Sequence, residues 1–362
     1  MTAPLRLGVL GCGMIGSAYL RQAHAVDGVR VTAICSPTAS SRDSALRLWP
    51  TARAHGDRSA LLDDPAVDAI LVCTPHAHHC TDAVAALEAG KHVLIEKPIA
   101  TSLRELDELE LAAARHDRVV VALPLVDRPA LTAVADLLGS GIIGAPMEFT
   151  SMLDVPGPPR SNWYYSREAV AGPALDTLPY ALSRLLALTG ATPSAATASV
   201  TQAIRHRRCL DGGTLTQQVE DHMSMQLTFL TGQQALVKSS WCLHRPEDYL
   251  IVRGRSGDIR LDCWRNRILV RSRTPPEQPH HTATWEDTPA FGIDLPSADP
   301  EHVKLTALVA AVATHTNILA ESAFTMRLIL TGLATHTGAV KVPPAAGGAQ
   351  PLVDLRIGQE YL

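Results

Sequence analysis

The sequence predicts an α/β protein of two domains: an N-terminal doubly wound parallel sheet, then an α+β domain with a large, open, mostly antiparallel sheet. Three observations lead to this fold class. The chain has 362 residues, and a domain usually holds about 150. Strand-like and helix-like segments alternate up to residue 125, and short runs of alternating apolar and polar residues follow. We therefore expect domains over residues 1–125 and 126–362.

The N-terminal domain is predicted from short apolar strands separated by helical segments. Leu5–Leu10 is the first apolar run, and Ile15–Ala25 after it has helical spacing. Parallel strands joined by helices form right-handed units, so the helices should cover both faces of one sheet. The segments that follow are the strands Val29–Cys35 and Ala69–Cys73, the helix Asp82–Ala89, the strand His92–Ile95, the helix Ser102–Arg115 and the strand Val119–Leu123.

The C-terminal domain is predicted from alternation with a period of two residues. In Met223–Phe229 every second residue is apolar, which is typical of a strand with one covered face. An open sheet of this kind needs a partner, so we expect a homodimer or homotetramer. The other expected elements are the extended segments Met147–Leu153, Gln234–Trp241, Tyr249–Arg253 and Asp258–Asp262 and the helices Ala181–Leu188, His302–Thr314 and Ser322–Thr335.

The composition excludes several classes of protein. Basic and acidic residues number 32 and 36, a net charge of −4, so no cationic surface is expected for nucleic acid or an anionic membrane. The seven cysteines form no CxxC pair, which is typical of free thiols in a reducing compartment. There is no long apolar run and no secretory signal pattern, so we expect a soluble cytoplasmic protein.

A glycine-rich motif lies between the first predicted strand and helix. Gly11, Gly13 and Gly16 form a GxGxxG, with Met14 and Ile15 at the start of the helix. Glycines at these positions allow a tight turn, a close approach of the backbone to a pyrophosphate, and close packing of helix on strand. The motif predicts a dinucleotide-binding Rossmann domain, although a glycine-rich turn in another α/β fold has the same pattern.

The end of the second strand bears on which dinucleotide binds. An NAD-specific site usually has an acidic residue there, but this chain has Ser36, followed by Arg42. A hydroxyl and a guanidinium suit a 2′-phosphate better than a bare ribose, which favours NADP(H). Asp43 could bind the ribose hydroxyls instead, so NAD(H) remains possible.

Two further motifs make a family resemblance specific. Thr74–His79, with the sequence TPHAHH, follows a strand, and Glu96-Lys97-Pro98 ends the next one. Together with the glycines they resemble the Gfo/Idh/MocA family, and the likeness continues more loosely through residues 140–144, 220–221 and 254–257. The resemblance implies a Rossmann domain, a substrate-binding C-terminal domain, and hydride transfer to or from NAD(P). It also implies that the cofactor contacts Thr74, Pro75, His76, His79, Glu96 and Lys97.

The resemblance assigns the central chemical role to Lys97. The family's lysine at this position hydrogen-bonds the reacting oxygen beside the nicotinamide, where a cation stabilises a developing alkoxide. Its Pro98 neighbour often follows a cis peptide in the family, and His79 would line the nicotinamide region. A surface lysine in a loop is the alternative. The three histidines at 76, 78 and 79 could also suggest a metal site, but no suitably spaced carboxylate or cysteine accompanies them, so no metal is expected.

The family's second catalytic motif, Asp-x-Gly-x-His-x-x-Asp, matches only in part within Gly172–Arg184. Asp176 is retained, and the family's tyrosine branch implies that Tyr180 is the acid/base. If Asp176 caps the helix, Tyr180 and Arg184 share one helical face and both can contact substrate. Tyr180 as an interface aromatic is the alternative. The positions that depart from the motif are Leu178, Tyr180 and Ser183.

Aromatic and basic residues precede this helix. Arg160, Trp163, Tyr164 and Tyr165 suit stacking on a sugar ring and binding an anionic group, although loop packing would use the same residue types. We expect an NAD(P)-dependent enzyme that moves a hydride between nicotinamide and a secondary alcohol or ketone of a sugar, sugar derivative or cyclic polyol. The alternative is a non-catalytic, nucleotide-sensing regulator on the same fold.

Overall fold

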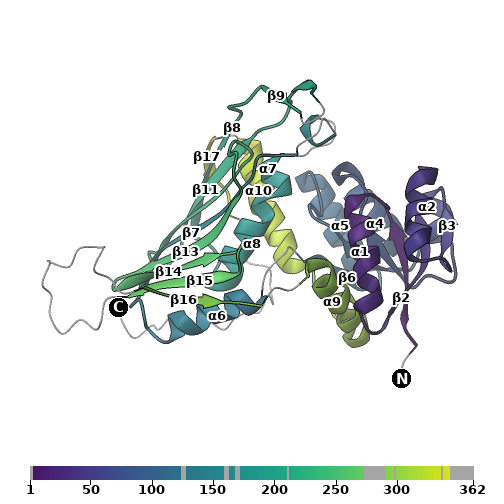
Figure 1. Ribbon diagram of the computed structural model, residues 1–362, viewed down its shortest axis with the longest axis horizontal. Coiled ribbons are helices and arrows are strands. Elements are labelled where there is room, and N and C mark those ends of the chain that lie inside the picture. Colours follow the sequence, from purple (N-terminus) through teal and green to yellow (C-terminus); the bar gives the residue numbers. More distant parts are fainter. Residues whose placement is uncertain are drawn as a thin grey trace, which may run out of the picture. The chain divides into compact units, whose positions relative to one another are not determined.

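The computed structural model describes residues 3–123, 128–158, 163–167, 172–209, 212–272, 290–296, 299–335 and 337–342. These residues form two compact units (Figure 1). The first unit contains residues 3–123 and 299–327, and the second contains residues 128–296 and those from 328 onward, within the described ranges.

The first unit is built on a six-stranded sheet in the order β3-β2-β1-β4-β5-β6. Every pair of neighbouring strands is parallel, which confirms the predicted doubly wound sheet. The strands are β1 Leu5–Leu10, β2 Val29–Cys35, β3 Arg53–His55, β4 Ala69–Val72, β5 His92–Ile95 and β6 Val120–Val121. The helices of this part of the chain are α1 Met14–Gln22, η1 Ala23–Ala25, α2 Ala39–Leu48, α3 Arg58–Leu62, η2 His76–His78, α4 His79–Glu88 and α5 Leu103–Arg115.

The strand order reverses between β1 and β4, which the chain visits first and fourth. In open parallel sheets, ligands bind in the crevice at the carboxyl ends of the strands at such a reversal. Gly11 follows β1 and Thr74 follows β4 there. The glycine-rich loop and the TPHAHH segment are therefore neighbours at the expected ligand-binding edge.

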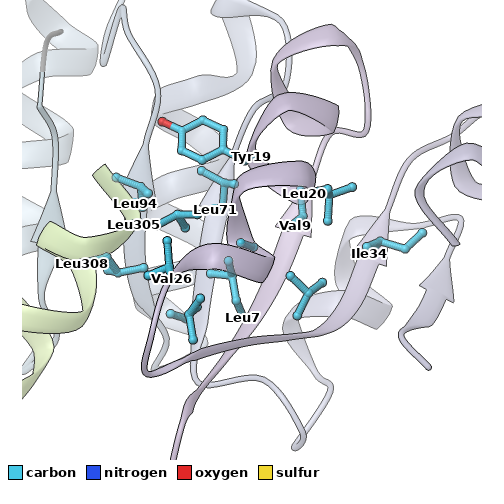
Figure 2. Packing of buried hydrophobic residues seen from close by; sticks show 14 of the residues in the cluster. Leu7, Val9, Tyr19, Leu20, Val26, Ile34, Leu71, Leu94, Leu305 and Leu308 are labelled. Carbon is cyan, nitrogen blue, oxygen red and sulfur yellow. The ribbon is translucent and has the colours of Figure 1, made fainter. Parts of the chain in front are cut away.

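Helix α9, Pro300–Thr314, packs in the first unit although it comes near the end of the sequence. Its Leu305 and Leu308 are fully buried, and Figure 2 shows them beside Val26 and Leu94. Asp299 is the N-cap of this helix, and its carboxylate accepts the N–H groups of two first-turn residues. We expected residues 302–314 within the second domain, because periodicity shows that a helix has an apolar face but not which sheet it covers.

The second unit is built on a nine-stranded sheet in the order β16-β15-β14-β13-β7-β12-β11-β8-β17. All neighbours are antiparallel except β7 and β12, which confirms a mostly antiparallel sheet. Its strands are β7 Pro146–Asp154, β8 Ala195–Thr201, β11 His222–Thr228, β12 Gln234–Ser240, β13 Glu247–Gly254, β14 Gly257–Asp262, β15 Arg267–Ser272, β16 Ala290–Asp294 and β17 Thr337–Val340. A separate hairpin pairs β9 His206–Arg208 with β10 Thr214–Thr216.

Helices cover one face of this sheet. The α8 helix, Leu178–Thr189, lies along β7 and β12, and the Ser151 hydroxyl donates to the Ala181 carbonyl at 2.7 Å. Met223, Met225 and Leu227 of β11 are buried on the same side, as their alternation predicts, while the residues between them are at least partly exposed. The remaining helices here are α6 Arg128–Gly139, η3 Trp163–Tyr165, α7 Pro173–Asp176 and α10 Ala320–Thr335, which continues from the first unit.

Three properties of the described residues bear on function. None of their helices is long and apolar enough to cross a membrane. They contain no cluster of three or more His, Cys, Asp or Glu side chains that could hold a metal ion. All seven cysteines lie among them, and each is a free thiol.

The position of α9 gives a stability prediction. Leu308→Ala should lower the free energy of unfolding by about 2–5 kcal/mol, because it opens a cavity in the core of the first unit. Thr306→Ala, at an exposed position on the same helix, is the matched control and should change it by less than about 0.5 kcal/mol. Urea unfolding followed by circular dichroism measures both. Equal stability of the two variants would mean that α9 is not part of this core.

Candidate nucleotide and substrate site

The glycine-rich loop has one position that the protein itself leaves open. Gly11 has φ +98°, and a Cβ there would lie 2.5 Å from the Cys73 carbonyl oxygen. A Cβ at Gly16 would overlap the Gly11 carbonyl oxygen. At Gly13, by contrast, no described atom beyond its chain neighbours lies within 4 Å of an added Cβ. The fold requires glycine at positions 11 and 16, whereas the open space at Gly13 fits a bound pyrophosphate.

Of the two residues after the open position, Met14 faces outward and Ile15 packs against the core. Met14 is 77% exposed at the first position of α1, and Ile15 is partly buried. Most large apolar side chains in this unit are in the core. An exposed methionine beside the Gly13 space is therefore suited to contact a bound ligand.

The structure brings Ser36 and Arg42 together at the end of β2, as the sequence predicts. The Arg42 Nη1 donates to the Ser36 carbonyl at 2.7 Å and to the Pro37 carbonyl at 3.0 Å. The Ser36 hydroxyl lies 3.5 Å from the Thr38 hydroxyl. Asp43 is exposed on α2. The Arg42 guanidinium is thus held against the backbone of this loop.

The loop after β4 is fixed by a carboxylate of α4. Asp82 is buried, accepts the Thr74 hydroxyl at 2.7 Å, and accepts Arg58 Nη1 of α3 at 2.7 Å. Pro75 follows, and the buried His76 ring packs edge-on against His79. Side chains of the protein itself therefore hold the TPHAHH segment in place.

His79 joins two strand ends. Its Nε2 lies 2.6 Å from the Thr74 carbonyl, and its Nδ1 lies 2.9 Å from the Pro98 carbonyl. Burial lowers the pKa of His79, while the two carbonyl oxygens act in the other direction. Because both partners only accept hydrogen bonds, a neutral ring donates to one of them at a time. The structure places His79 as a buried link between the loop after β4 and the residue after Lys97, rather than at the surface.

Glu96 and Lys97 follow β5 at the same edge of the sheet. The Lys97–Pro98 peptide is cis, and Lys97 is partly exposed. The Glu96 side chain is buried and accepts hydrogen bonds from the Tyr19 hydroxyl, from Lys304 Nζ at 2.5 Å, and from the Lys97 backbone N–H at 3.1 Å. The Glu96 carboxylate therefore points toward protein groups, and its predicted contact with cofactor stays a prediction.

Nearby charged and polar groups shift the pKa of Glu96 strongly. Burial by itself would raise the pKa of this carboxyl, but the Lys304 ammonium, the Tyr19 hydroxyl and the charge of Lys97 lower it to about 2. The neighbouring Tyr19 hydroxyl has a pKa well above its ordinary value, because it is buried and faces this carboxylate. Glu96 is thus an anion, and Tyr19 a neutral donor, across the physiological pH range.

In the second unit, two predicted site residues are selectively exposed. Residues 172–189 are all buried except Asp176 and Tyr180, which are partly exposed and four positions apart. Asp176 ends α7 and Tyr180 lies in the first turn of α8. The capping prediction is wrong: Thr177, not Asp176, is the N-cap of α8, because the chain is already helical from Pro173. Pro179 lies in the first turn of this helix, where its missing N–H costs no hydrogen bond.

Other predicted substrate contacts fare differently. Arg184 is buried; its Nη2 pairs with Asp248 at 2.7 Å and its Nη1 donates to Cys263 Sγ at 2.8 Å, so the sheet engages its guanidinium. Arg160 and the Trp163 side chain lie outside the described residues. Tyr165 packs edge-on against the buried Trp241, in the way that the packing alternative anticipates.

Glu220 is a carboxylate whose contacts could not be predicted from the spacing of residues in the sequence. It lies two positions before β11, and its carboxylate accepts the Ala174 N–H at 3.3 Å at the start of α7. It also lies against Gly172, where a Cβ would overlap its oxygens. The pKa of Glu220 is raised to about 7, chiefly by burial and to a lesser degree by the charge of Asp221, while hydrogen bonds from backbone N–H groups lower it. In the sequence, the Glu-Asp pair at 220–221 is part of the family resemblance, but it does not indicate which helix Glu220 contacts.

The open space at Gly13 predicts a variant that folds and does not bind. Gly13→Val should abolish nucleotide binding measured by calorimetry and keep a folded circular dichroism spectrum, because the added atoms meet ligand and not protein. Gly16→Val is the control: its side chain overlaps the Gly11 carbonyl, so it should lose the fold as well. Unchanged nucleotide affinity in Gly13→Val would overturn the assignment of this loop.

Glu220 predicts a pH-dependent stability. Its pKa is raised in the folded protein, so its contribution is fully present below the unfolded value near 4.5 and is lost as pH rises through about 7. Glu220→Gln should therefore match the wild type near pH 5 and be more stable by about 2 kcal/mol near pH 8.5. Urea unfolding at the two pH values tests this, with Glu88→Gln as an exposed control. A constant difference between Glu220→Gln and the wild type would refute a buried titrating carboxyl.

Sequence comparisons agree with these features. A profile described as "Oxidoreductase family, NAD-binding Rossmann fold" matches residues 5–123, and one described as "GFO/IDH/MocA C-terminal domain" matches residues 131–260. The dTDP-3,4-didehydro-2,6-dideoxy-alpha-D-glucose 3-reductase of Actinomadura kijaniata is 28% identical over 75% of this chain and 76% of its own length. Inositol 2-dehydrogenase of Salmonella typhimurium is 31% identical over 40% of this chain, a match that spans 44% of that enzyme.

Solved structures share the fold over nearly the whole chain. Levoglucosan dehydrogenase in complex with NADH and levoglucosan aligns with a TM-score of 0.79 and 19% identity, covering 94% of this chain and 100% of that one. A 3-ketoreductase from Actinomadura kijaniata in complex with NADP and TDP-benzene aligns with a TM-score of 0.74 and 23% identity, covering 90% and 96%. With its glycine motif, its Glu-Lys-Pro motif and both domains matched, this chain belongs to the Gfo/Idh/MocA family of NAD(P)-dependent oxidoreductases.

Proposed function

We propose that this protein is an NADP(H)-dependent oxidoreductase that interconverts a secondary alcohol and a ketone on a sugar, sugar derivative or cyclic polyol. The observation that carries the proposal is a shared edge: the glycine loop, Thr74 and Lys97 follow the carboxyl ends of the neighbouring strands β1, β4 and β5. The names of the relatives support the substrate class, since they include an inositol dehydrogenase and a deoxysugar 3-reductase.

The residues of the first unit fit a dinucleotide. The space above Gly13 accepts the pyrophosphate, with the N-terminus of α1 directed at it. Thr74, Pro75 and the surroundings of His76 and His79 form the adjacent loop, held by Asp82. When bound, the nicotinamide supplies or accepts the hydride.

Lys97 in this proposal donates a hydrogen bond to the reacting oxygen. A cation there stabilises negative charge that grows on the oxygen in the transition state, and it polarises a carbonyl in the reverse direction. Tyr180 transfers the proton at its hydroxyl, and Asp176 accepts a substrate hydroxyl to orient the ring. The selective exposure of Asp176 and Tyr180 supports these two roles. Arg184 has no role at the substrate in this proposal, because its guanidinium binds Asp248 and Cys263.

The preference for NADP(H) rests on the loop after β2. No carboxylate occupies position 36, and Arg42 is held beside Ser36 by two hydrogen bonds to the loop backbone. A guanidinium fixed in this way presents its remaining N–H groups to a phosphate with little entropy left to lose. The 3-ketoreductase structure that shares this fold was solved with NADP.

Lys97 provides the test of catalysis. Lys97→Ala should lower kcat by at least ~10²-fold and change the Kd of the nucleotide much less, because the lost contact develops in the transition state. Turnover is measured with wild type and variant on levoglucosan, myo-inositol and dTDP-linked keto-deoxysugars. Near-wild-type turnover in the variant would exclude Lys97 as a catalytic residue. Tight nucleotide binding with no turnover of any polyol or sugar would favour the regulatory alternative.

Arg42 tests the cofactor preference. Arg42→Ala should weaken NADPH binding by about 10-fold or more, the loss of one charge-assisted contact, and leave NADH binding nearly unchanged. Fluorescence titration with each nucleotide measures both constants, and Arg47→Ala on the exposed side of α2 is the control. Equal weakening for NADPH and NADH would show that Arg42 serves loop packing, and would return the ribose role to Asp43.

A further inference from the structure

A buried lysine from the far end of the sequence binds the carboxylate next to the proposed catalytic lysine. Lys304 of α9 contacts the Glu96 carboxylate at 2.5 Å, 208 positions away in sequence. Both side chains are 8% exposed. The Tyr19 hydroxyl donates to the same Glu96 oxygen, and the Lys304 ammonium lies 6.0 Å from the Tyr19 ring centroid.

Glu96 has two cationic neighbours. Lys304 is in direct contact, and the adjacent Lys97 also lowers the pKa of the carboxyl through its charge. Other titratable groups that face this cluster are Tyr19 from α1, Cys73 after β4, His79 from α4 and Glu301 from α9. Among the described residues that act on Glu96, Lys304 and Lys97 are the two with a positively charged side chain.

Removal of Lys304 would leave a buried carboxylate without its strongest partner. A buried charge that loses its partner is costly, typically by several kcal/mol, and a nearby opposite charge moves to replace it. Lys97 is the neighbouring residue, with a long flexible side chain. Its ammonium would then be drawn inward, onto Glu96.

We infer that Lys304 is a positioning residue for the reaction: by saturating the Glu96 carboxylate, it keeps that carboxylate from drawing the Lys97 ammonium away from the reacting oxygen. The inference rests on the catalytic role proposed for Lys97. It assigns to α9 a part in the chemistry beyond its packing in the core.

The first measurement needs no substrate. The chain has five lysines, at 91, 97, 238, 304 and 341, so spectra of protein labelled with ¹³C and ¹⁵N in lysine resolve the titration of each ammonium. In Lys304→Met the Lys97 ammonium should titrate at a pH higher by about one unit, as expected for a group that gains a close anion. An unchanged Lys97 titration in a folded Lys304→Met variant overturns the inference.

The second measurement uses turnover. Lys304→Met should lower kcat by at least about 10-fold, move the alkaline limb of the pH–rate profile upward, and change the nucleotide Kd by less than about threefold. The double variant Glu96→Gln/Lys304→Met has no carboxylate to capture Lys97, so both kcat and the limb should return toward those of Glu96→Gln alone. If Lys304 serves packing only, the double variant is at least as impaired as Lys304→Met, which overturns the inference.

Two controls separate the possible failures. Lys91→Met removes another lysine of the first unit, whose ammonium binds the Asp64 and Val67 carbonyls, and should leave kcat and the Lys97 titration unchanged. If Lys304→Met does not fold, Lys304→Gln, which keeps a hydrogen-bond donor for Glu96, takes its place: a Lys97 titration at higher pH than in the wild type supports the inference, and an unchanged one overturns it. Full turnover in Lys97→Ala refutes the proposed function, whereas normal turnover in Lys304→Met with an inactive Lys97→Ala refutes this inference alone.

Discussion

The ion pair between Glu96 and Lys304 is the interaction on which the arrangement of the first unit depends. One buried carboxylate receives the ammonium of α9, the hydroxyl of α1 and the backbone N–H of Lys97. Each partner comes from a different segment, so the pair fixes the residue after β5 relative to both helices. Ion pairs this deeply buried rarely add much to stability compared with an apolar core of the same shape. Its more specific consequence is to set the charge around Lys97.

The remaining strand ends are held by contacts of the same kind. Asp82 and His79, both on α4, bind the hydroxyl and the carbonyl of Thr74, and His79 also reaches the Pro98 carbonyl. Protein contacts therefore hold the loops after β4 and β5, which suits a site that orients a nicotinamide and a reacting oxygen. In the second unit, Glu220 supports the start of α7 in a comparable way, through the Ala174 N–H.

The features that could be predicted from the sequence are those that depend on residues close together in the chain. The GxGxxG loop and the alternation in β11 follow from local spacing, and both sheets formed as expected. The structure also distinguishes the roles of the three glycines, because the backbone conformation requires glycine at positions 11 and 16 but not at position 13. Three local predictions did not extend to the actual structure: the cap of α8 is Thr177, α9 packs in the first unit, and Arg184 is in a buried ion pair.

The contacts that could not be predicted join residues far apart in the chain. Lys304 and Glu96 are 208 positions apart, and a single lysine on an apolar helix gives no sign of its partner. Glu220 and Ala174 meet across 46 positions, and their contact depends on the absence of a side chain at Gly172. Such pairs follow from the packing of helices on sheets, which a periodic pattern leaves undetermined.

A crystal structure of the wild-type protein with NADP(H) bound tests the central claim most directly, because it shows where the Lys97 ammonium points when the nicotinamide is in place. The Lys97 Nζ should lie beside the nicotinamide C4, within hydrogen-bond reach of a substrate or water oxygen, while Glu96 keeps Lys304 and Tyr19 as its partners. A Lys97 ammonium bound to the Glu96 carboxylate and turned away from C4 would contradict both the proposed role of Lys97 and the division of charge between the two lysines.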